Sequence, residues 1–346
     1  MARLIRLVSG KGGVSAASYQ AGIAEAAAII RAGGLVGFPT ETVYGLAADG
    51  LNANAVAKVY AVKERPLDSA LILHLADAGE AVSYVRDLPP GATDLMNAFW
   101  PGPLTLVMGK APHVPDITSG GRDNIGLRVP DHPVARDLVR SAGVAVVGPS
   151  ANLSGRPSPM TAADVLDELG DRIDAVLDAG PTSLGIESTV LDLTASPPTV
   201  LRLGSITPDA LEQCLGRSVA LPSPTHVVGP APARGLRFRL IVVDGPDPES
   251  NARAAVRLAT QTADTGARVA LLSQEGLATD MPDNVAVVSL GSAGDVVTAA
   301  ASLYPALRAC EAAGYSTVFV PAIQRVGLGL AVMHRLDKLA ADVVKI

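Results

Sequence analysis

The stretch from Leu35 to Pro66 constrains the fold of this chain more than any other part of its sequence. It opens with an apolar run at residues 35–38 and continues with a polar, turn-like segment at 39–47. After Asn52, apolar residues recur at helical spacing. Asn52 has the side chain of a good helix N-cap, and Pro66 cannot continue a helix. This part of the sequence therefore predicts a strand, a polar loop and a helix, in that order.

Two cations stand where this helix should end. Lys63 and Arg65 are two residues apart, so a chain that leaves the helix in an extended conformation would point both side chains the same way. Cations that face hydroxyls and a carboxylate at the ends of a strand and a helix suit an anionic ligand. We expect that ligand to carry a phosphate group.

The size and composition of the chain favour a two-domain enzyme that acts on metabolites. At 346 residues the chain exceeds the usual length of one domain, and 48% apolar residues are enough for a sizeable core. The formal net charge of -6 argues against a protein that coats nucleic acid through bulk electrostatics. A local basic patch remains compatible with this charge.

Neither the cysteines nor the histidines have the spacing of metal ligands. Cys214 and Cys310 lie far apart in the sequence, so we expect two reduced thiols, and the histidines are scattered. No signal-peptide pattern opens the chain, and no apolar run reaches membrane-spanning length. We therefore expect a cytoplasmic protein that does not enter a membrane.

A glycine-rich segment with a lysine lies near the N-terminus. Residues 9–14 follow a predicted strand at 4–8, but they lack the spacing of a phosphate-binding loop. We expect this segment to be a flexible lead into a helix at residues 18–31.

A second strand–loop–helix unit follows near the middle of the chain. A fully apolar strand at 144–147 leads into a loop rich in Ser, Asn and Gly, and a helix at 162–169 comes next. Thr161 and Asp164 have the spacing of a capping box. This layout is common at anion-binding sites because free N–H groups and the helix dipole both favour negative charge. An ordinary polar turn is the alternative interpretation.

Two polar residues lie inside predicted strands. His74 belongs to a strand at 70–75, where a histidine is more often a core residue than a ligand contact. Arg128 belongs to an alternating strand at 124–130, and it is costly to bury without a carboxylate partner. The residues alone leave open whether that partner is a structural Asp or Glu or the carboxylate of a ligand.

The motifs of the first two-thirds of the chain resemble one known family. The run Pro39-Thr40-Glu41-Thr42-Val43-Tyr44-Gly45-Leu46, followed by Lys63-x-Arg65-Pro66, is closely similar to the YrdC/Sua5 family. The similarity extends over residues 13–210. It implies an α/β fold with a YrdC-like catalytic domain, a twisted mixed sheet with helices, at residues 1–215.

The last third of the chain predicts a second domain. Residues 216–235 are rich in Pro, Gly and Ser and predict a linker. In residues 236–346, strands alternate with helices, which is typical of a small parallel sheet of Rossmann-like outline. The dinucleotide fingerprint is missing after the first of these strands. The run at 327–331 ahead of 335–340 resembles the extra C-terminal domain of the longer, Sua5-type members.

The resemblance implies an L-threonylcarbamoyladenylate synthase, which is a nucleotidyltransferase. Such an enzyme combines ATP, L-threonine and bicarbonate or CO2 into threonylcarbamoyl-AMP and pyrophosphate for the t6A modification of tRNA. This chemistry needs positioning and neutralisation of charge more than covalent help from the protein. Mg²⁺ would bind with ATP through phosphate oxygens and waters, so we expect no metal ligands from the protein.

The family's site residues transfer to this chain by motif. Lys63 and Arg65 would be the catalytic residues, and Glu41 and Glu187 are acidic candidates to shape the charge nearby without acting as bases. The residues implied for ATP binding are Lys63, Leu67, Asn124, Ser150, Asn152, Ser158 and Arg202. The residues implied for L-threonine binding are Thr40, His74, Arg128, Gly148 and Ser188.

The sequence departs from the family pattern at two places. Ser69-Ala70-Leu71 stands where the family usually has Asn-Pro-Leu, which removes a rigid turn beside the cationic pair. In the linker, Gly229-Pro230-Ala231-Pro232 stands where the family typically has His-Tyr-Ala-Pro, so an aromatic contact to the nucleotide is missing.

Two other functions remain open at the level of the sequence. One is a related carbamoyl-adenylate-forming enzyme, as in hydrogenase maturation or natural-product carbamoylation. The other is a non-catalytic RNA-binding YrdC-like module, although the acidic net charge and the lack of paired aromatics on strands count against it. For the synthase, the resemblance implies a downstream tRNA threonylcarbamoyl-transfer machinery as partner and leaves a contact with tRNA open.

Overall fold

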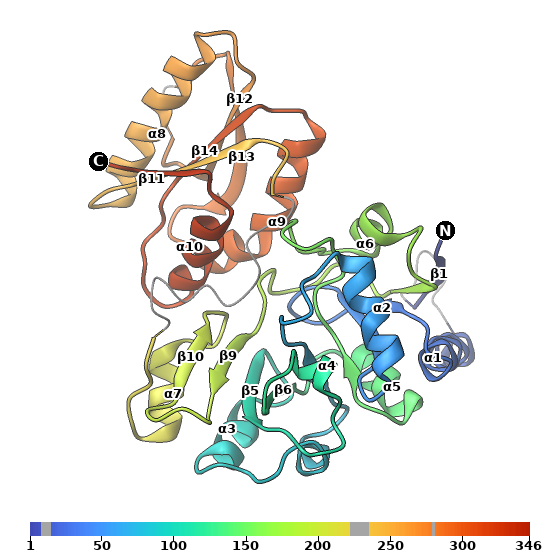
Figure 1. Ribbon diagram of the computed structural model, residues 1–346. Helices are drawn as coiled ribbons and strands as arrows, with labels where there is room; N and C mark the ends of the chain where they lie inside the picture. Colours follow the sequence, from blue (N-terminus) through green and yellow to red (C-terminus); the bar gives the residue numbers. More distant parts are fainter. Residues whose placement is uncertain (8–14, 222–234, 279–280) are drawn as a thin grey trace. The chain divides into compact units, whose positions relative to one another are not determined.

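The computed structural model describes residues 1–7, 15–221, 235–278 and 281–346. The chain divides into two compact units (Figure 1). Unit 1 comprises Met1–Ser154, Ser158–Ser183 and Glu187–Ala233, and unit 2 comprises Gly155–Pro157, Leu184–Ile186 and Arg234–Ile346. The glycine-rich segment at 9–14 and the linker run at 229–232 lie outside the described residues.

Unit 1 is built on a mixed β-sheet. Its described strands, in their order across the sheet, are β1 (Arg3–Arg6), β8 (Ala175–Asp178), β2 (Val36–Phe38), β3 (Gly45–Asp49), β7 (Val146–Val147), β4 (Ile72–His74), β6 (Asn124–Arg128), β5 (Leu104–Gly109), β9 (Thr189–Asp192) and β10 (Thr199–Arg202). Parallel pairs, such as β4 with β6, alternate irregularly with antiparallel pairs, such as β5 with β6. The mixed sheet expected for the catalytic domain is confirmed.

Helices connect and cover these strands. They are α1 (Ala16–Arg31), α2 (Ala53–Lys63), the 3-10 helix η1 (Ala78–Ser83), α3 (Ala92–Phe99), α4 (Asp116–Ser119), α5 (Pro133–Ala142), α6 (Ala162–Leu169) and α7 (Pro208–Leu215). Apolar side chains of α1 and α5 form a buried core with the strands at one end of the sheet, including Ile30, Val36, Leu138 and Leu177. Burial of this apolar surface is what stabilises short strands that pair with distant parts of the chain.

The helix starts follow from local chemistry. The Asn52 side chain accepts hydrogen bonds from the backbone N–H groups of Asn54 and Ala55 at the start of α2. Thr161 and Asp164 form a reciprocal capping box at the start of α6. Both predicted caps are confirmed.

Unit 2 has a smaller sheet in which all strand pairs are parallel. The strands, in their order across the sheet, are β13 (Val285–Ser292), β12 (Val269–Glu275), β14 (Thr317–Pro321), β11 (Arg239–Asp244) and β15 (Asp342–Lys345). The connecting helices are α8 (Pro248–Ala263), α9 (Val296–Ala312) and α10 (Leu328–Leu339). This arrangement confirms the Rossmann-like outline predicted for the C-terminal part.

Two local predictions are wrong, and one strand was not predicted. Residues 45–47 were expected in the polar loop, but they begin β3, which pairs with β2 and β7. The last helix ends at Leu339, and the chain then adds β15 beside β11. The chain does not leave α2 in an extended conformation, because Glu64 caps the helix with a left-handed backbone, φ 53°.

The helices of unit 1 and unit 2 are too short or too polar to cross a lipid bilayer, as far as the described residues extend.

Candidate active site

Lys63, the last residue of α2, forms hydrogen bonds with the loop that follows β7. Its side chain is buried, with only 1% of the residue exposed. The ammonium group donates hydrogen bonds to the backbone carbonyls of Ser150 and Asn152, the latter at 2.6 Å. A lysine has three N–H donors, so these two contacts leave one for another acceptor. The structure thus brings together Lys63, Ser150 and Asn152, which lie almost 90 residues apart in the sequence.

The burial of this cationic group has an electrostatic consequence. Burial lowers the pKa of Lys63 well below its ordinary value, the positive charge of Arg65 lowers it further, and Glu168 acts in the opposite direction. Arg65 donates from Nη2 to the carbonyl of Ala70 at 3.1 Å. Its buried Nε has no hydrogen-bond partner in the described part of the chain. An anion placed here would therefore favour the charged form of Lys63 and accept from Arg65.

Two other residues expected at the nucleotide, Ser158 and Arg202, form hydrogen bonds within the chain. Ser158 donates to Glu187 Oε1 at 2.6 Å, and Arg202 donates to the carbonyl and hydroxyl oxygens of Ser188 at 2.9 and 2.8 Å. Asn124 is the first residue of β6, and Leu67 is 62% exposed.

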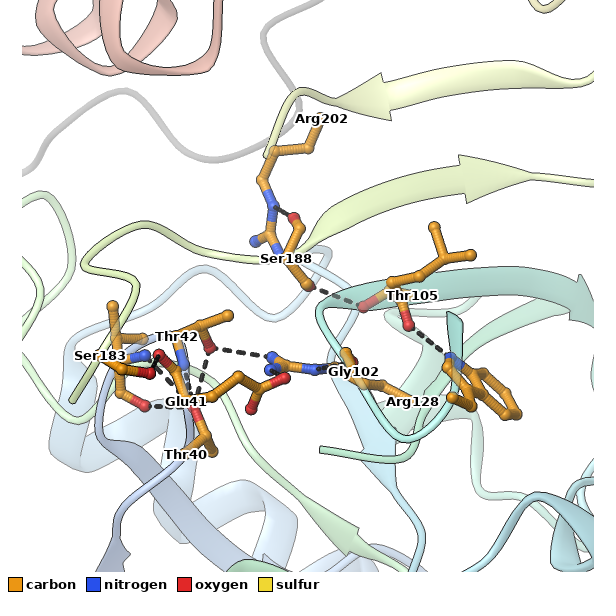
Figure 2. A network of polar contacts seen from close by, with 12 residues as sticks. Thr40, Glu41, Thr42, Gly102, Thr105, Arg128, Ser183, Ser188 and Arg202 are labelled. Carbon is orange, nitrogen blue, oxygen red and sulfur yellow. Dashed lines mark hydrogen bonds and ion pairs between the residues drawn. The ribbon is translucent and has the colours of Figure 1, made fainter. Parts of the chain in front are cut away.

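Arg128 is the centre of a second, buried cluster (Figure 2). It is the last residue of β6 and is 4% exposed. Its Nε donates to the carbonyl of Gly102 at 3.1 Å, and its Nη1 donates to the hydroxyl of Thr42 at 3.0 Å. Its Nη2 lies 2.7 Å from Oε1 of Glu41. A carboxylate partner for Arg128 was expected from the sequence, and the structure supplies one from the chain itself.

The loop that carries Glu41 is shaped by the hydroxyl group of Thr40. This hydroxyl accepts from the backbone N–H groups of Thr42 and Val43 and donates to the carbonyl of Val43 at 2.7 Å. The hydroxyl of Thr42 lies 2.8 Å from it, so Thr40 and Arg128 are joined through Thr42. Side-chain bonds to the nearby backbone fix such turns, which places Glu41 on the Arg128 side.

His74 lies beside Arg128 in the sheet. The two residues are register partners at the ends of β4 and β6. His74 is 2% exposed, and burial, followed by the charge of Arg128, lowers its pKa to about 3. The imidazole is therefore neutral near pH 7. Its Nδ1 is buried without a hydrogen-bond partner among the residues that the structure describes.

Gly148 makes room for this imidazole. A Cβ atom at residue 148 would lie 2.5 Å from Nδ1 of His74 and 3.1 Å from the ring of Phe38. Atoms that close would have to move, so glycine is the residue that fits. His74 and Gly148, both expected at the amino-acid site, are thus in direct proximity.

Ser188 is a further buried polar residue, and it contacts Thr105 and Arg202. Its hydroxyl lies 2.8 Å from that of Thr105 in β5 and accepts from Nη2 of Arg202. Thr105 was not expected from the sequence, because a single threonine in an apolar strand carries no signal. Thr42 lies inside the recognised motif, but its hydrogen bond to Arg128 spans 86 residues and could not be predicted.

The described residues contain no group of three or more His, Cys, Asp or Glu side chains that could hold a metal ion. The two acidic candidates from the sequence, Glu41 and Glu187, lie beside Arg128 and Ser158 respectively.

Two family models match the chain. One is described as "Telomere recombination" and covers the Sua5, YciO and YrdC proteins; it matches residues 28–204. The other is described as "Threonylcarbamoyl-AMP synthase, C-terminal domain" and matches residues 236–341. The first match lies mainly in unit 1 and the second lies in unit 2.

Similar proteins match this chain along most of its length and of their own. A threonylcarbamoyl-AMP synthase of Pyrococcus abyssi is 36% identical over 321 residues, which is 90% of this chain and 92% of the relative. A threonylcarbamoyl-AMP synthase of Bacillus subtilis is 37% identical over 333 residues, 92% of each chain. Among solved structures, P. abyssi Sua5 complexed with L-threonine superposes with a TM-score of 0.88 at 33% identity and covers 99% of each chain. A double-alanine variant of the same protein has a TM-score of 0.89 at 33% identity, covering 100% of this chain and 98% of the other.

Proposed function

Because the chain belongs to the YrdC/Sua5 family, in the form that carries the Sua5 C-terminal domain, we propose that it is a threonylcarbamoyl-AMP synthase. The proposed enzyme converts L-threonine, bicarbonate and ATP into threonylcarbamoyl-AMP, pyrophosphate and water; with CO2 in place of bicarbonate, no water is formed. The observation that carries this proposal is the match along the whole chain to P. abyssi Sua5 complexed with L-threonine.

We place the amino acid at the cluster around Arg128. The guanidinium group would bind the carboxylate of threonine, since charge-assisted and bidentate contacts of this kind are the strong ones. The neutral His74, with its unpartnered Nδ1, would hydrogen-bond an uncharged group of the substrate, such as its hydroxyl. Thr40 and Ser188 would line the same space, and Gly148 would keep it open.

We place the phosphates of ATP at Lys63 and Arg65, which would be the catalytic cations. Both have N–H donors left over in the described structure, and the buried position of Lys63 makes an incoming anion especially favourable. The loop with Ser150 and Asn152, held by Lys63, would contact the nucleotide together with Leu67, Asn124, Ser158 and Arg202.

The proposed chemistry is a nucleotidyl transfer. Threonine, once its amine has lost a proton, forms a new N–C bond with the carbon of CO2 or bicarbonate. With CO2, one C–O π bond opens and the nitrogen loses a second proton. With bicarbonate, the C–O bond to its hydroxyl group breaks, and that hydroxyl leaves as water with the second proton. An oxygen of the resulting carbamate attacks the α-phosphorus of ATP, and the bond between that phosphorus and the leaving pyrophosphate breaks. The charge that develops on the phosphates is what Lys63 and Arg65 would stabilise.

Magnesium would arrive as part of the substrate, MgATP. Its role would be to neutralise the triphosphate and to orient it for in-line attack. The product is a mixed anhydride of a carbamate and a phosphate, so we expect a tRNA threonylcarbamoyl-transfer machinery to consume it.

The test is pyrophosphate release by the purified full chain with magnesium. We expect release only when ATP, L-threonine and bicarbonate are all present, and loss of release in Lys63→Ala and Arg65→Ala variants that remain folded. Pyrophosphate release that needs bicarbonate but does not need L-threonine in particular would instead indicate a related carbamoyl-adenylate-forming enzyme. RNA binding without any ATP turnover would indicate an RNA-binding module.

A further inference from the structure

The carboxylate of Glu41 is buried and incompletely bonded. The residue is 7% exposed, and its Oε1 lies 2.7 Å from Nη2 of Arg128. Neither carboxylate oxygen has a partner with hydrogen-bond geometry among the described residues. The pair is thus close but misaligned. An ionised carboxylate offers about four acceptor positions, so most of those on Glu41 are unused.

The position of this carboxylate is nevertheless fixed. The loop turn at Thr40 sets the backbone on one side, and the carbonyl of Glu41 accepts a hydrogen bond from the hydroxyl of Ser183 at 3.3 Å. Figure 2 shows the side chain of Glu41 directed at the guanidinium group of Arg128. Unused acceptors on a fixed, buried anion indicate a group that a ligand completes.

Arg128 can accept a ligand carboxylate without losing Glu41. A guanidinium group has five N–H donors. One donates to Gly102 and one to Thr42, and one more faces Glu41. Two donors remain for an incoming carboxylate.

Charge balance then indicates which ligand fits. The Glu41–Arg128 pair carries no net charge, and a buried charge is costly unless it is compensated. A zwitterion leaves every charge compensated when its carboxylate meets Arg128 and its ammonium meets Glu41. A carboxylic acid without an amine would place two anions on one arginine.

We propose that Glu41 binds the α-ammonium group of the amino-acid substrate and makes the site selective for amino acids over carboxylic acids that lack the amine. This role rests on the proposed function, because it takes Arg128 as the group that binds the substrate carboxylate. Glu41 is then a specificity-determining residue as well as a partner of Arg128.

The test compares two ligands by calorimetry on the full chain. One is L-threonine, and the other is 2,3-dihydroxybutanoate of the same configuration, which has a hydroxyl group in place of the ammonium. We expect wild-type protein to prefer threonine by tenfold or more. The variant Glu41→Gln, which keeps the size of the side chain and removes its charge, should lose about tenfold to hundredfold in affinity for threonine. Its affinity for the hydroxy acid should stay the same or rise.

A matched control separates recognition of the amine from support of Arg128. Thr42→Val removes a hydroxyl that accepts from Arg128 but leaves the charge of Glu41 in place. This variant should weaken both ligands by similar factors. If Glu41→Gln also weakens both ligands equally, Glu41 merely supports Arg128 and the proposal is overturned.

The role of Glu41 can be tested even if the Glu41→Gln variant does not fold, and it can be tested separately from the catalytic reaction. If Glu41→Gln does not fold, equal binding of the two ligands by wild-type protein still overturns it. Adenylate formation by a wild-type protein that lacks the preference would refute the role of Glu41 alone. A preference for threonine without any pyrophosphate release would refute the proposed function and support the role of Glu41.

Discussion

The neutral state of His74 predicts a measurable dependence of stability on pH. In the folded protein its pKa is lowered from 6.5 to about 3, chiefly by burial and then by Arg128. Below pH 6.5 the unfolded chain binds a proton at this histidine, while the folded chain stays unprotonated down to about pH 3. The stability that the neutral His74 contributes is therefore fully present above pH 6.5 and is lost progressively as the pH falls towards 3. Between pH 8 and pH 5, this one residue should remove about 2 kcal/mol from the free energy of unfolding.

The assay follows unfolding of unit 1 alone. Trp100 is the only tryptophan of the chain, it belongs to unit 1, and it is 8% exposed. Its fluorescence during urea unfolding should give the free energy of unfolding at pH 8 and at pH 5 for the wild type and for His74→Asn. Asparagine does not titrate, so the variant should lose about 2 kcal/mol less than the wild type over this range.

A control and a contrary result complete this experiment. Leu73→Val lies on the same strand and lowers stability without removing a titrating group, so its loss between pH 8 and pH 5 should equal that of the wild type. If His74→Asn loses as much stability as the wild type, the histidine is not held neutral. His74 would then not be the neutral partner proposed for an uncharged group of the substrate.

Three further predictions concern the proposed substrates and the packing around them. Lys63→Met removes one buried cation, so adenylate formation should fall about a hundredfold or more. The loss of its two hydrogen bonds to loop carbonyls should lower the free energy of unfolding by about 1–3 kcal/mol each. Unchanged pyrophosphate release would contradict the binding of the ATP phosphates by Lys63. Arg128→Gln should raise KM for L-threonine about tenfold to hundredfold and leave KM for ATP unchanged, whereas steady-state kinetics with an effect confined to ATP would show that the carboxylate is bound elsewhere. Gly148→Ala places a Cβ atom 2.5 Å from Nδ1 of His74, so stability should fall by about 1–3 kcal/mol and KM for threonine should rise; wild-type values for both in Trp100-monitored unfolding and kinetics would mean that the two residues are not in contact.

Interactions between residues close in the sequence were predicted correctly at two helix starts. The cap at Asn52 and the capping box of Thr161 and Asp164 each depend on residues within three positions, so the sequence alone contains the whole interaction. The same holds for the alternation of strands and helices in residues 236–346, which gives a parallel sheet.

Elements that depend on distant partners were missed. The strand at 45–49 lies between two others in the sheet, and its small residues carry no alternating pattern of their own. The strand at 342–345 pairs with one that lies about a hundred residues earlier. Tertiary pairing decides such short strands, and local propensity does not.

In the candidate site, too, some features could be predicted from the sequence and others could not. An arginine inside the strand at 124–128 predicted a carboxylate partner, because an unpaired charge is costly to bury. The sequence could not identify Glu41 as that partner, since 87 positions separate the two residues. The left-handed backbone of Glu64 was equally hidden, because non-glycine residues seldom adopt it. For that reason the predicted extended exit with Lys63 and Arg65 side by side was wrong.

In the proposed function, the protein joins a carbamoylated amino acid to the α-phosphate of ATP. Mass spectrometry of a reaction with ¹³C-labelled bicarbonate, L-threonine and MgATP tests it most directly. We predict an AMP adduct that contains threonine and carries the heavy carbon. Pyrophosphate with an unlabelled threonyl-AMP would mean that the amino acid's own carboxylate attacks ATP, and it would contradict the claim, as would the absence of any adduct.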